Sequence, residues 1–179
     1  LDGPDQLRQR VAFALSEVLV VSDQNATLNN WQESVANYYD LLVDGAFGNY
    51  RDLLEQVTLS PLMGIYLTYL RNAKADPKTG ALPDENYARE VMQLFTIGLN
   101  ELQPDGTLRL DPRGLPIATY DNGTITEMAK VFTGWSFHSD SPGNASLFRR
   151  GAPDYIQPMT LFPSAHEEGA KTIISGIEL

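Results

Sequence analysis

The chain has 179 residues and 42% of them are hydrophobic, so it can bury one substantial core and we expect a single domain. The formal net charge of -10 argues against nucleic acid as a partner, because phosphate binding requires clustered lysine and arginine. The chain has no cysteine, which excludes disulfides, thiol catalysis and thiolate metal sites. No apolar run approaches the ~18 residues that a membrane-spanning helix requires.

Residues 4–70 show the hydrophobic periodicity of successive amphipathic helices. Pro4 suits the first position of a helix, and apolar residues follow at helical spacing to about Val21. The spacing from Asn30 to Glu33 is that of a capping box, in which two side chains bond the free backbone amides of a first turn. It predicts that a second helix begins there.

Two further helices and a loop are predicted before residue 84. Asn49 can cap a third helix, because its short side-chain oxygen reaches a free backbone amide. The Ser-Pro pair at Ser60 favours the start of a fourth helix that continues to Leu70. Residues 71–83 are polar and contain proline and glycine, a composition typical of a mobile loop.

Residues 84–98 predict a fifth helix with a defined start and end. Asp84 follows a proline and can cap the first turn, and Gly98 can adopt the left-handed conformation that ends a helix. One arc of the helical wheel is apolar and the opposite arc is polar. The polar arc consists of Glu85, Asn86, Arg89, Glu90, Gln93 and Thr96.

After residue 98 the pattern changes from helical spacing to turns. Residues 102–120 contain proline and glycine turns with alternating leucines, which indicate one or two tight turns and a short hairpin. Thr124 and Glu127 again have capping-box spacing, and they predict a helix that Gly134 ends.

Residues 136–179 are expected to be irregular, with short strands at 159–162 and 172–174. The elements together predict a mainly α fold, namely a multi-helix, orthogonal or bundle-like domain with a small β-hairpin and an irregular C-terminal segment. We expect residues 1–179 to form one helical domain, in which residues 84–135 hold two helices and their connecting hairpin.

Four motifs in the second half of the chain follow one another in an informative order. They are residues 84–98 (Asp-Glu-Asn-Tyr-Ala-Arg-Glu-Val-Met-Gln-Leu-Phe-Thr-Ile-Gly), residues 100–111 with 114–120, residues 126–135 (Thr-Glu-Met-Ala-Lys-Val-Phe-Thr-Gly-Trp), and Met159 followed by residues 166–172. This arrangement resembles the bacterial family catalogued as domain of unknown function 1800, and the two helical motifs resemble its signature helices. The similarity covers most of the chain, loosely before residue 60 and closely after residue 84.

The resemblance implies that the chain is a fragment of a longer bacterial protein that is secreted or periplasmic. Members of this uncharacterised family are often encoded beside a sulfatase-like protein, so a protein of that kind becomes a candidate partner. No catalytic residues are known for the family, and none can be carried over to this sequence. The oligomeric state stays open.

Polar side chains of the two signature helices and of the tail are candidates for one cluster. Its expected members are Glu85, Asn86, Arg89, Glu90, Glu127, Trp135 and Lys171. If the helices lie side by side, Arg89 can bridge Glu90 or Glu127, and Lys171 can complete the set. The cluster would serve either as a structural clamp or as an active site with a desolvated carboxylate as general acid or base. The catalytic candidates are Glu90, Glu127 and His166.

Metal and cofactor sites have little support in the sequence. Asp105, Asp111 and Asp121 are weak calcium candidates, because they lack the ligand pattern of an EF-hand and because aspartate before glycine or proline is common in turns. His138 and His166 are the only histidines, and their spacing is not that of a zinc site. Nucleophile-elbow, phosphate-loop and dinucleotide-binding motifs are absent from the sequence, so we expect no metal and no cofactor.

Two functional classes stay open. The first is a helical scaffold or interaction domain of a larger exported bacterial protein, acting with an envelope-associated partner. The second is a hydrolase-like enzyme that uses Glu90 or Glu127 on an envelope or extracellular polymer. An enzyme requires a pocket where these carboxylates converge with Arg89 and His166, whereas in a scaffold the same groups would satisfy one another.

Overall fold

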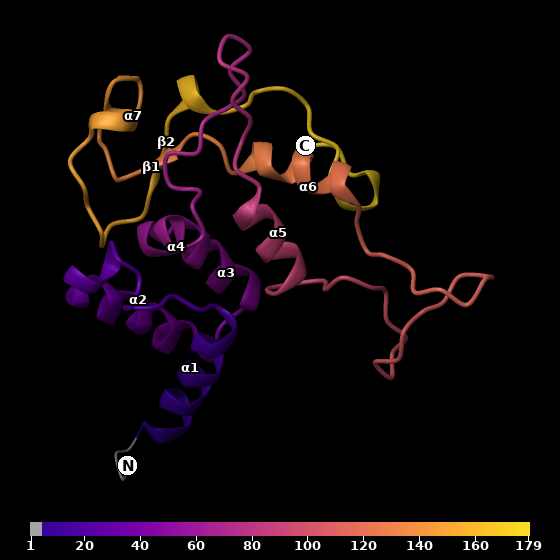
Figure 1. Cartoon of the computed structure of the whole chain (residues 1–179). Helices are drawn as coiled ribbons and strands as arrows, with labels where there is room; N and C mark the ends of the chain where they lie inside the picture. The colour runs from indigo at the N-terminus through magenta and orange to yellow at the C-terminus, as the bar shows by residue number, and fades with distance from the viewer. Residues whose placement is uncertain (1–4) are drawn as a thin grey trace.

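A computed structural model describes residues 5–179, and within that range the protein has seven α-helices and one two-stranded sheet (Figure 1). This confirms the mainly α class with little β structure; Pro4, expected near a helix start, lies outside the described residues. The helices are α1 (Gln6–Val18), α2 (Gln32–Gly45), α3 (Tyr50–Leu59), α4 (Pro61–Tyr66), α5 (Asn86–Gln93), α6 (Asn122–Val131) and α7 (Leu147–Arg150). The antiparallel strands are β1 (Trp135–Ser136) and β2 (Thr160–Leu161).

The first four helices pack consecutively, α1 on α2, α2 on α3 and α3 on α4. Their inward faces form the lower part of the main core in Figure 1. Its fully or nearly fully buried side chains are Ala12, Leu19, Leu28, Tyr38, Leu42, Leu53, Val57, Leu62 and Met63. The hydroxyl of Tyr38 donates to the carbonyl of Leu19 at 2.7 Å, so its polar end is satisfied inside the core.

Three aromatic rings join the first four helices to the signature helices. Tyr69, which follows α4, and Tyr87 of α5 are stacked with centroids 4.0 Å apart, and Phe132 at the end of α6 meets Tyr87 edge-on. Both tyrosine hydroxyls bind Thr58 of α3. The Tyr69 hydroxyl donates to the Thr58 carbonyl at 2.6 Å, and the Tyr87 hydroxyl lies 2.7 Å from the Thr58 hydroxyl. Burial raises the pKa of Tyr69 well above its ordinary range.

The predicted starts of the third and fourth helices agree with the structure. The Asn49 side chain accepts a hydrogen bond from the Arg51 amide at 2.8 Å, and Pro61 occupies the first turn of α4 after Ser60. The fourth helix is nevertheless shorter than expected. It ends at Tyr66, because Thr68 adopts the left-handed conformation with φ of 65° and so cannot continue a right-handed helix.

Both predicted capping boxes are wrong. Asn30 lies in a 3-10 turn, Leu28–Asn30, and gives no side-chain cap to α2, which begins at Gln32. Helix α6 begins before the predicted box. Asp121 lies in extended conformation directly before the helix and accepts a hydrogen bond from the Thr124 amide at 2.8 Å. Thr124 is therefore inside the first turn rather than in front of it.

Helix α5 is also shorter than the predicted 84–98. The carboxylate of Asp84 accepts from the Asn86 amide at 2.8 Å, so it does hold the first turn. The helix ends at Gln93, and the amide of Gly98, whose φ is 73°, bonds back to the Met92 carbonyl at 3.0 Å. The carbonyl of Phe95 accepts from the Tyr50 hydroxyl at 2.7 Å instead of from a further helical turn.

The tail is attached at the end of α6 and is mostly irregular, as expected, with the strand at 160–161 confirmed and α7 as an additional short helix. The strand expected at 172–174 is wrong. Thr172 makes only an isolated bridge with Glu178, and a 3-10 turn, Ile174–Gly176, lies between them.

Candidate functional site

The two signature helices lie side by side, and Glu85 joins them. Its carboxylate accepts from the Thr126 hydroxyl of α6 at 2.8 Å and from the Arg89 guanidinium at 3.2 Å. The prediction that Arg89 bridges Glu90 or Glu127 is wrong, because Glu85 lies one helical turn away on the same face and is already oriented by Thr126. The Arg89 and Glu85 side chains are 41% and 39% exposed, so this ion pair stabilises only weakly.

The other two candidate carboxylates do not meet Arg89. Glu127 pairs with Lys130 of its own helix at 2.5 Å. Glu90 is half-buried on α5, and no hydrogen bond or ion pair reaches its carboxylate from any of residues 5–179. Within the described residues, Glu90 and Glu127 therefore share no hydrogen-bond or ion-pair partner.

His166 and Trp135 belong to the attachment of the tail. The Nδ1 of His166 lies 2.8 Å from the carbonyl of Thr133, and the amide of Glu167 donates to the Thr133 hydroxyl at 2.9 Å. Since a carbonyl only accepts, Nδ1 carries the proton in this bond. Thr133 is completely buried, so these bonds fasten the tail to the end of α6. Trp135 lies in β1, opposite Leu161.

Lys171 does not complete the polar cluster, which corrects the prediction. Its side chain is buried and its ammonium donates to the Gly169 carbonyl at 2.9 Å, within the tail itself. The expected single cluster is thus divided among the α5–α6 contact, the Thr133–His166 attachment and the tail.

Sequence reasoning missed a second polar group at the start of α5. Thr68 Oγ1 lies 3.0 Å from the Asp84 carboxylate, and the Asn86 side-chain amide lies 3.4 Å from the same hydroxyl. The side chain of Asn72 clamps the backbone of Asp84 with two hydrogen bonds of 2.8 and 3.1 Å. A β-branched threonine with positive φ is strained, and no sequence signal predicts it.

Of the three calcium candidates, Asp105 and Asp111 cap turns and Asp121 caps helix α6. The pKa of each is lowered, first by a backbone hydrogen bond from Thr107 to Asp105, from Leu115 to Asp111 and from Thr124 to Asp121. Within residues 5–179 no three histidine, aspartate or glutamate side chains gather as possible metal ligands.

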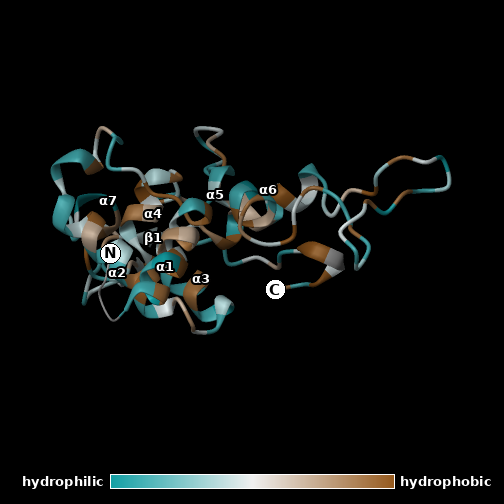
Figure 2. Ribbon diagram, turned by 90° about the horizontal axis from the view of Figure 1, so that it is seen from below, coloured by the Kyte–Doolittle hydropathy of each residue, from teal (hydrophilic) through white to brown (hydrophobic). Residues whose placement is uncertain are grey.

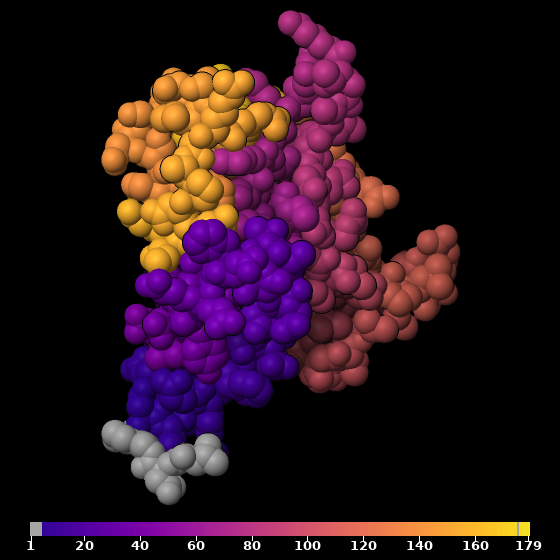
Figure 3. All heavy atoms as spheres, turned by 60° about the vertical axis from the view of Figure 1, so that its left-hand side comes forward, coloured from indigo at the N-terminus to yellow at the C-terminus, as the bar shows by residue number. Residues whose placement is uncertain are grey.

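An arm of residues 99–119 projects from the body between α5 and α6 (Figures 1 and 3). A closed ring of three backbone hydrogen bonds holds it: Glu101 N–H to Ile117 C=O at 2.8 Å, Ile117 N–H to Arg109 C=O at 3.1 Å, and Arg109 N–H to Glu101 C=O at 2.9 Å. Each of the three residues donates once and accepts once in this ring.

The ring follows an eight-residue repeat that the sequence prediction did not detect. Residues 102–106 (Leu-Gln-Pro-Asp-Gly) and 110–114 (Leu-Asp-Pro-Arg-Gly) share the pattern Leu-x-Pro-x-Gly. Each forms a tight turn in which the glycine, Gly106 or Gly114, has positive φ and bonds back three residues. The predicted hairpin is therefore two successive turns around one ring.

The surface of the arm is apolar, and four of its five charged side chains form ion pairs, Asp105 being the exception. Arg109 pairs with Glu101 at 2.5 Å, and Arg113 pairs with Asp111 at 3.0 Å. Large apolar side chains that are about half exposed run along the arm, as Figure 2 shows by the hydrophobic stretches. They are Leu99, Leu102, Leu108, Leu110 and Leu115.

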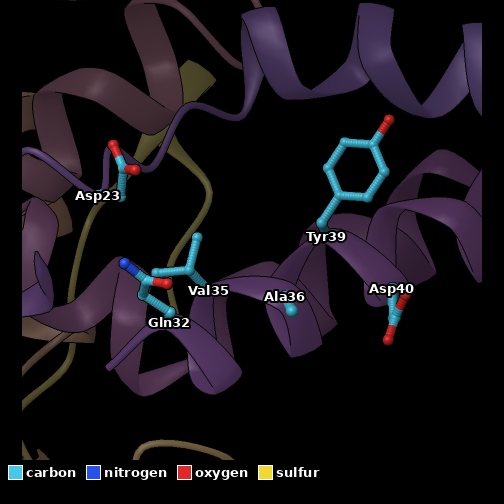
Figure 4. A pocket seen from close by; sticks show the side chains of 6 residues that line it. All are labelled: Asp23, Gln32, Val35, Ala36, Tyr39 and Asp40. Atoms are coloured by element: carbon cyan, nitrogen blue, oxygen red, sulfur yellow. The ribbon is translucent and has the colours of Figure 1, made fainter. Parts of the chain in front are cut away.

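Two hollows lie beside α2. The larger, about 470 Å³, is lined by Asp23, Gln32, Val35, Ala36, Tyr39 and Asp40 (Figure 4). Asp23 and Asp40 lie at opposite ends of that view, so their two carboxylates do not converge on one point. The smaller, about 120 Å³, is lined by Asn37, Leu41, Gln56, Leu59, Ser60, Ile156 and Pro158. Glu90, Glu127 and His166 line neither hollow.

Comparison with known proteins places the chain in a family. No helix within residues 5–179 has the length and apolar character needed to cross a bilayer. No curated protein and no solved structure matches the chain. The family model described as "Protein of unknown function (DUF1800)" matches residues 1–178. The chain therefore belongs to the DUF1800 family, in agreement with its four ordered motifs.

Proposed function

We propose that this domain is an interaction scaffold whose docking element is the arm of residues 99–119. The observation that carries the proposal is the row of half-exposed leucines on a projecting, internally braced arm. Contiguous exposed apolar surface on a soluble protein is typical of a protein-binding site. The paired charges of the arm favour an apolar complementary surface, because little net charge remains to attract a charged one.

The arrangement of the candidate catalytic residues supports a scaffold over a hydrolase. Glu85 binds both Arg89 and Thr126, and Glu127 binds Lys130. Hydrolysis by a pair of carboxylates requires two such groups facing one substrate. Within residues 5–179 the Glu90 carboxylate forms no hydrogen bond or ion pair, and His166 binds Thr133 instead.

The proposed partner is the sulfatase-like protein expected from the family resemblance, in an exported protein of the bacterial envelope. The experiment that tests this proposal is co-expression of this chain with the sulfatase-like protein encoded beside its gene. Calorimetric titration of one purified protein with the other then measures the Kd of the complex. Substitution of Leu102, Leu110 and Leu115 by serine should raise the Kd at least ~10-fold, because central apolar contacts dominate interface energies.

A control variant separates the arm from general surface hydrophobicity. Leu82→Ser changes a leucine that is 79% exposed in the segment of residues 71–83, outside the arm, and should leave the Kd unchanged. Wild-type affinity in the triple arm variant would remove the arm as the docking element, and no complex with the unmodified chain would remove the sulfatase-like partner. Hydrolysis of an extracellular polymer by the pure chain, lost in Glu90→Gln, would favour the enzyme.

A further inference from the structure

Helix α1 carries an apolar stripe that its own fold covers only in part, since Val11 is half-buried and the other three members are exposed. The stripe consists of Leu7, Val11, Ala14 and Val18, of which Leu7 is 69% and Val18 is 44% exposed. The core is contacted from another side of the helix, through Ala12, Leu15 and Leu19.

The spacing of this stripe is that of a helix-pairing seam. Its members alternate steps of four and three residues, the heptad spacing at which two helices interlock side chains along their length. Phe47, at the end of α2 and 57% exposed, extends the apolar surface near the start of α1, where the Arg8 guanidinium lies 4.9 Å from its ring centroid.

The charges beside the stripe select a direction for the pairing. Arg10 and Glu17 lie on the same flank of α1, one heptad apart, and neither forms an ion pair within residues 5–179. When two copies of α1 run antiparallel, with Leu7 beside Val18 of the second copy, Arg10 comes to face Glu17 of that copy. The two-fold axis produces this attraction twice. A parallel pair leaves each Arg10 a full heptad away from Glu17.

We infer that two copies of this chain associate through an antiparallel pair of α1 helices. The surface differs from the arm, so the inference stands independently of the proposed function. Helix α1 has 13 residues, and two such helices bury less than a standard protein interface. The association is therefore weak, with a Kd in the micromolar range or above.

The first test is sedimentation equilibrium of the 179-residue chain from about 10 µM to about 1 mM. The weight-average mass should rise from the monomer value of 19.8 kDa towards twice that value. Leu7→Ala should raise the Kd at least ~10-fold, because symmetry removes the contact twice. Leu82→Ala, at a leucine that is 79% exposed and distant from α1 in sequence, should not change it.

Charge exchange tests the antiparallel direction. Arg10→Glu alone, and Glu17→Arg alone, should weaken association, since each places like charges opposite one another, whereas the double variant should restore it. Because the chain has no cysteine, a Leu7→Cys, Val18→Cys variant reports the geometry directly. An antiparallel pair oxidises by joining position 7 to position 18.

Three outcomes would overturn the inference. A monomer mass throughout the concentration range would show that two copies do not pair through the stripe. Association unchanged by Leu7→Ala would move the interface elsewhere. Disulfides that join position 7 only to position 7 would establish a parallel pair.

Discussion

Gly134 and His166 approach so closely that no side chain fits between them: a Cβ on Gly134 would lie 2.9 Å from the Cβ of His166. Gly134 also has φ of 85°, which favours glycine. The amide of Phe162 donates to the Gly134 carbonyl, so Gly134 contacts the tail both at Phe162 and at His166. The conformation and the contact together attach the tail to the signature helices.

Gly134→Ala should therefore lower the free energy of unfolding by about 3 kcal/mol or more, from backbone strain and from the displaced His166. Gly80→Ala provides the control, because Gly80 has φ of 76° but nothing within 4 Å of an added Cβ. It should cost only ~1 kcal/mol. Urea unfolding of both variants measures the difference, and equal losses would show that the close approach is unimportant.

Alkaline pH should destabilise the protein through the buried tyrosines. Burial raises the pKa of Tyr87 to about 12. Its contribution to the free energy of unfolding is therefore complete below the pKa of about 10 that tyrosine has in the unfolded chain. The contribution is lost as pH rises from 10 to 12, by about 1.4 kcal/mol per pH unit, because the unfolded chain ionises first. Tyr87→Phe should cost ~1 kcal/mol at pH 7 for the bond to Thr58 and should flatten this pH dependence. Unfolding curves between pH 8 and pH 12 provide the measurement, and an unaltered slope in the variant would contradict it.

Arg89→Lys should change the free energy of unfolding by less than ~0.5 kcal/mol, because the guanidinium is part-exposed and has one ionic partner. Arg113→Lys, at an exposed ion pair of the arm, should have an equally small effect. Thermal unfolding of the two variants checks this. A selective loss above ~1.5 kcal/mol for Arg89→Lys would reveal a structural role that its contacts do not explain.

The cap of α6 should make stability sensitive to acid. The backbone hydrogen bond from Thr124 lowers the pKa of Asp121 in the folded protein. The resulting stabilisation is present at pH values above the ordinary aspartate pKa near 4, and it is lost as the pH falls through the lower pKa of the folded state. Asp121→Asn keeps an accepting oxygen and should show a smaller loss on acidification. Glu127→Gln changes the carboxylate that the sequence assigned to the cap and serves as the control. Equal acid sensitivity of wild type and Asp121→Asn would exclude this cap as the source.

The sequence predicted the elements that local chemistry determines. Asn49 and the Ser-Pro pair at Ser60 mark helix starts in the structure because capping involves only neighbouring residues. The capping box failed at Thr124 because Asp121 binds the Thr124 amide, and at Asn30 because that residue lies in a 3-10 turn and no side chain caps α2. The left-handed threonine, Thr68, depends on Asp84 sixteen residues later and has no local signature.

The candidate site was predicted less well than the fold, because ion pairs depend on side-chain direction between elements. The helical wheel placed Glu85 and Arg89 on one face correctly, and this i,i+4 pair is present. Bridging to Glu127 required the relative rotation of α5 and α6, which periodicity does not specify. The repeat in the arm is present in the sequence as Leu-x-Pro-x-Gly at an interval of eight residues. The ring of hydrogen bonds among Glu101, Arg109 and Ile117 depends on how the chain folds back on itself, which the repeat does not specify.

The ring at the base of the arm also limits how another chain can be recognised there. At Glu101, Arg109 and Ile117 both the backbone donor and the backbone acceptor are occupied, so these positions offer no free sheet edge for strand addition. Edge-to-edge aggregation is disfavoured for the same reason, although the arm is rich in leucine. A binding protein must therefore recognise the arm through its side chains. Such recognition does not require an extended strand in the partner, and its specificity depends on the positions of the leucines.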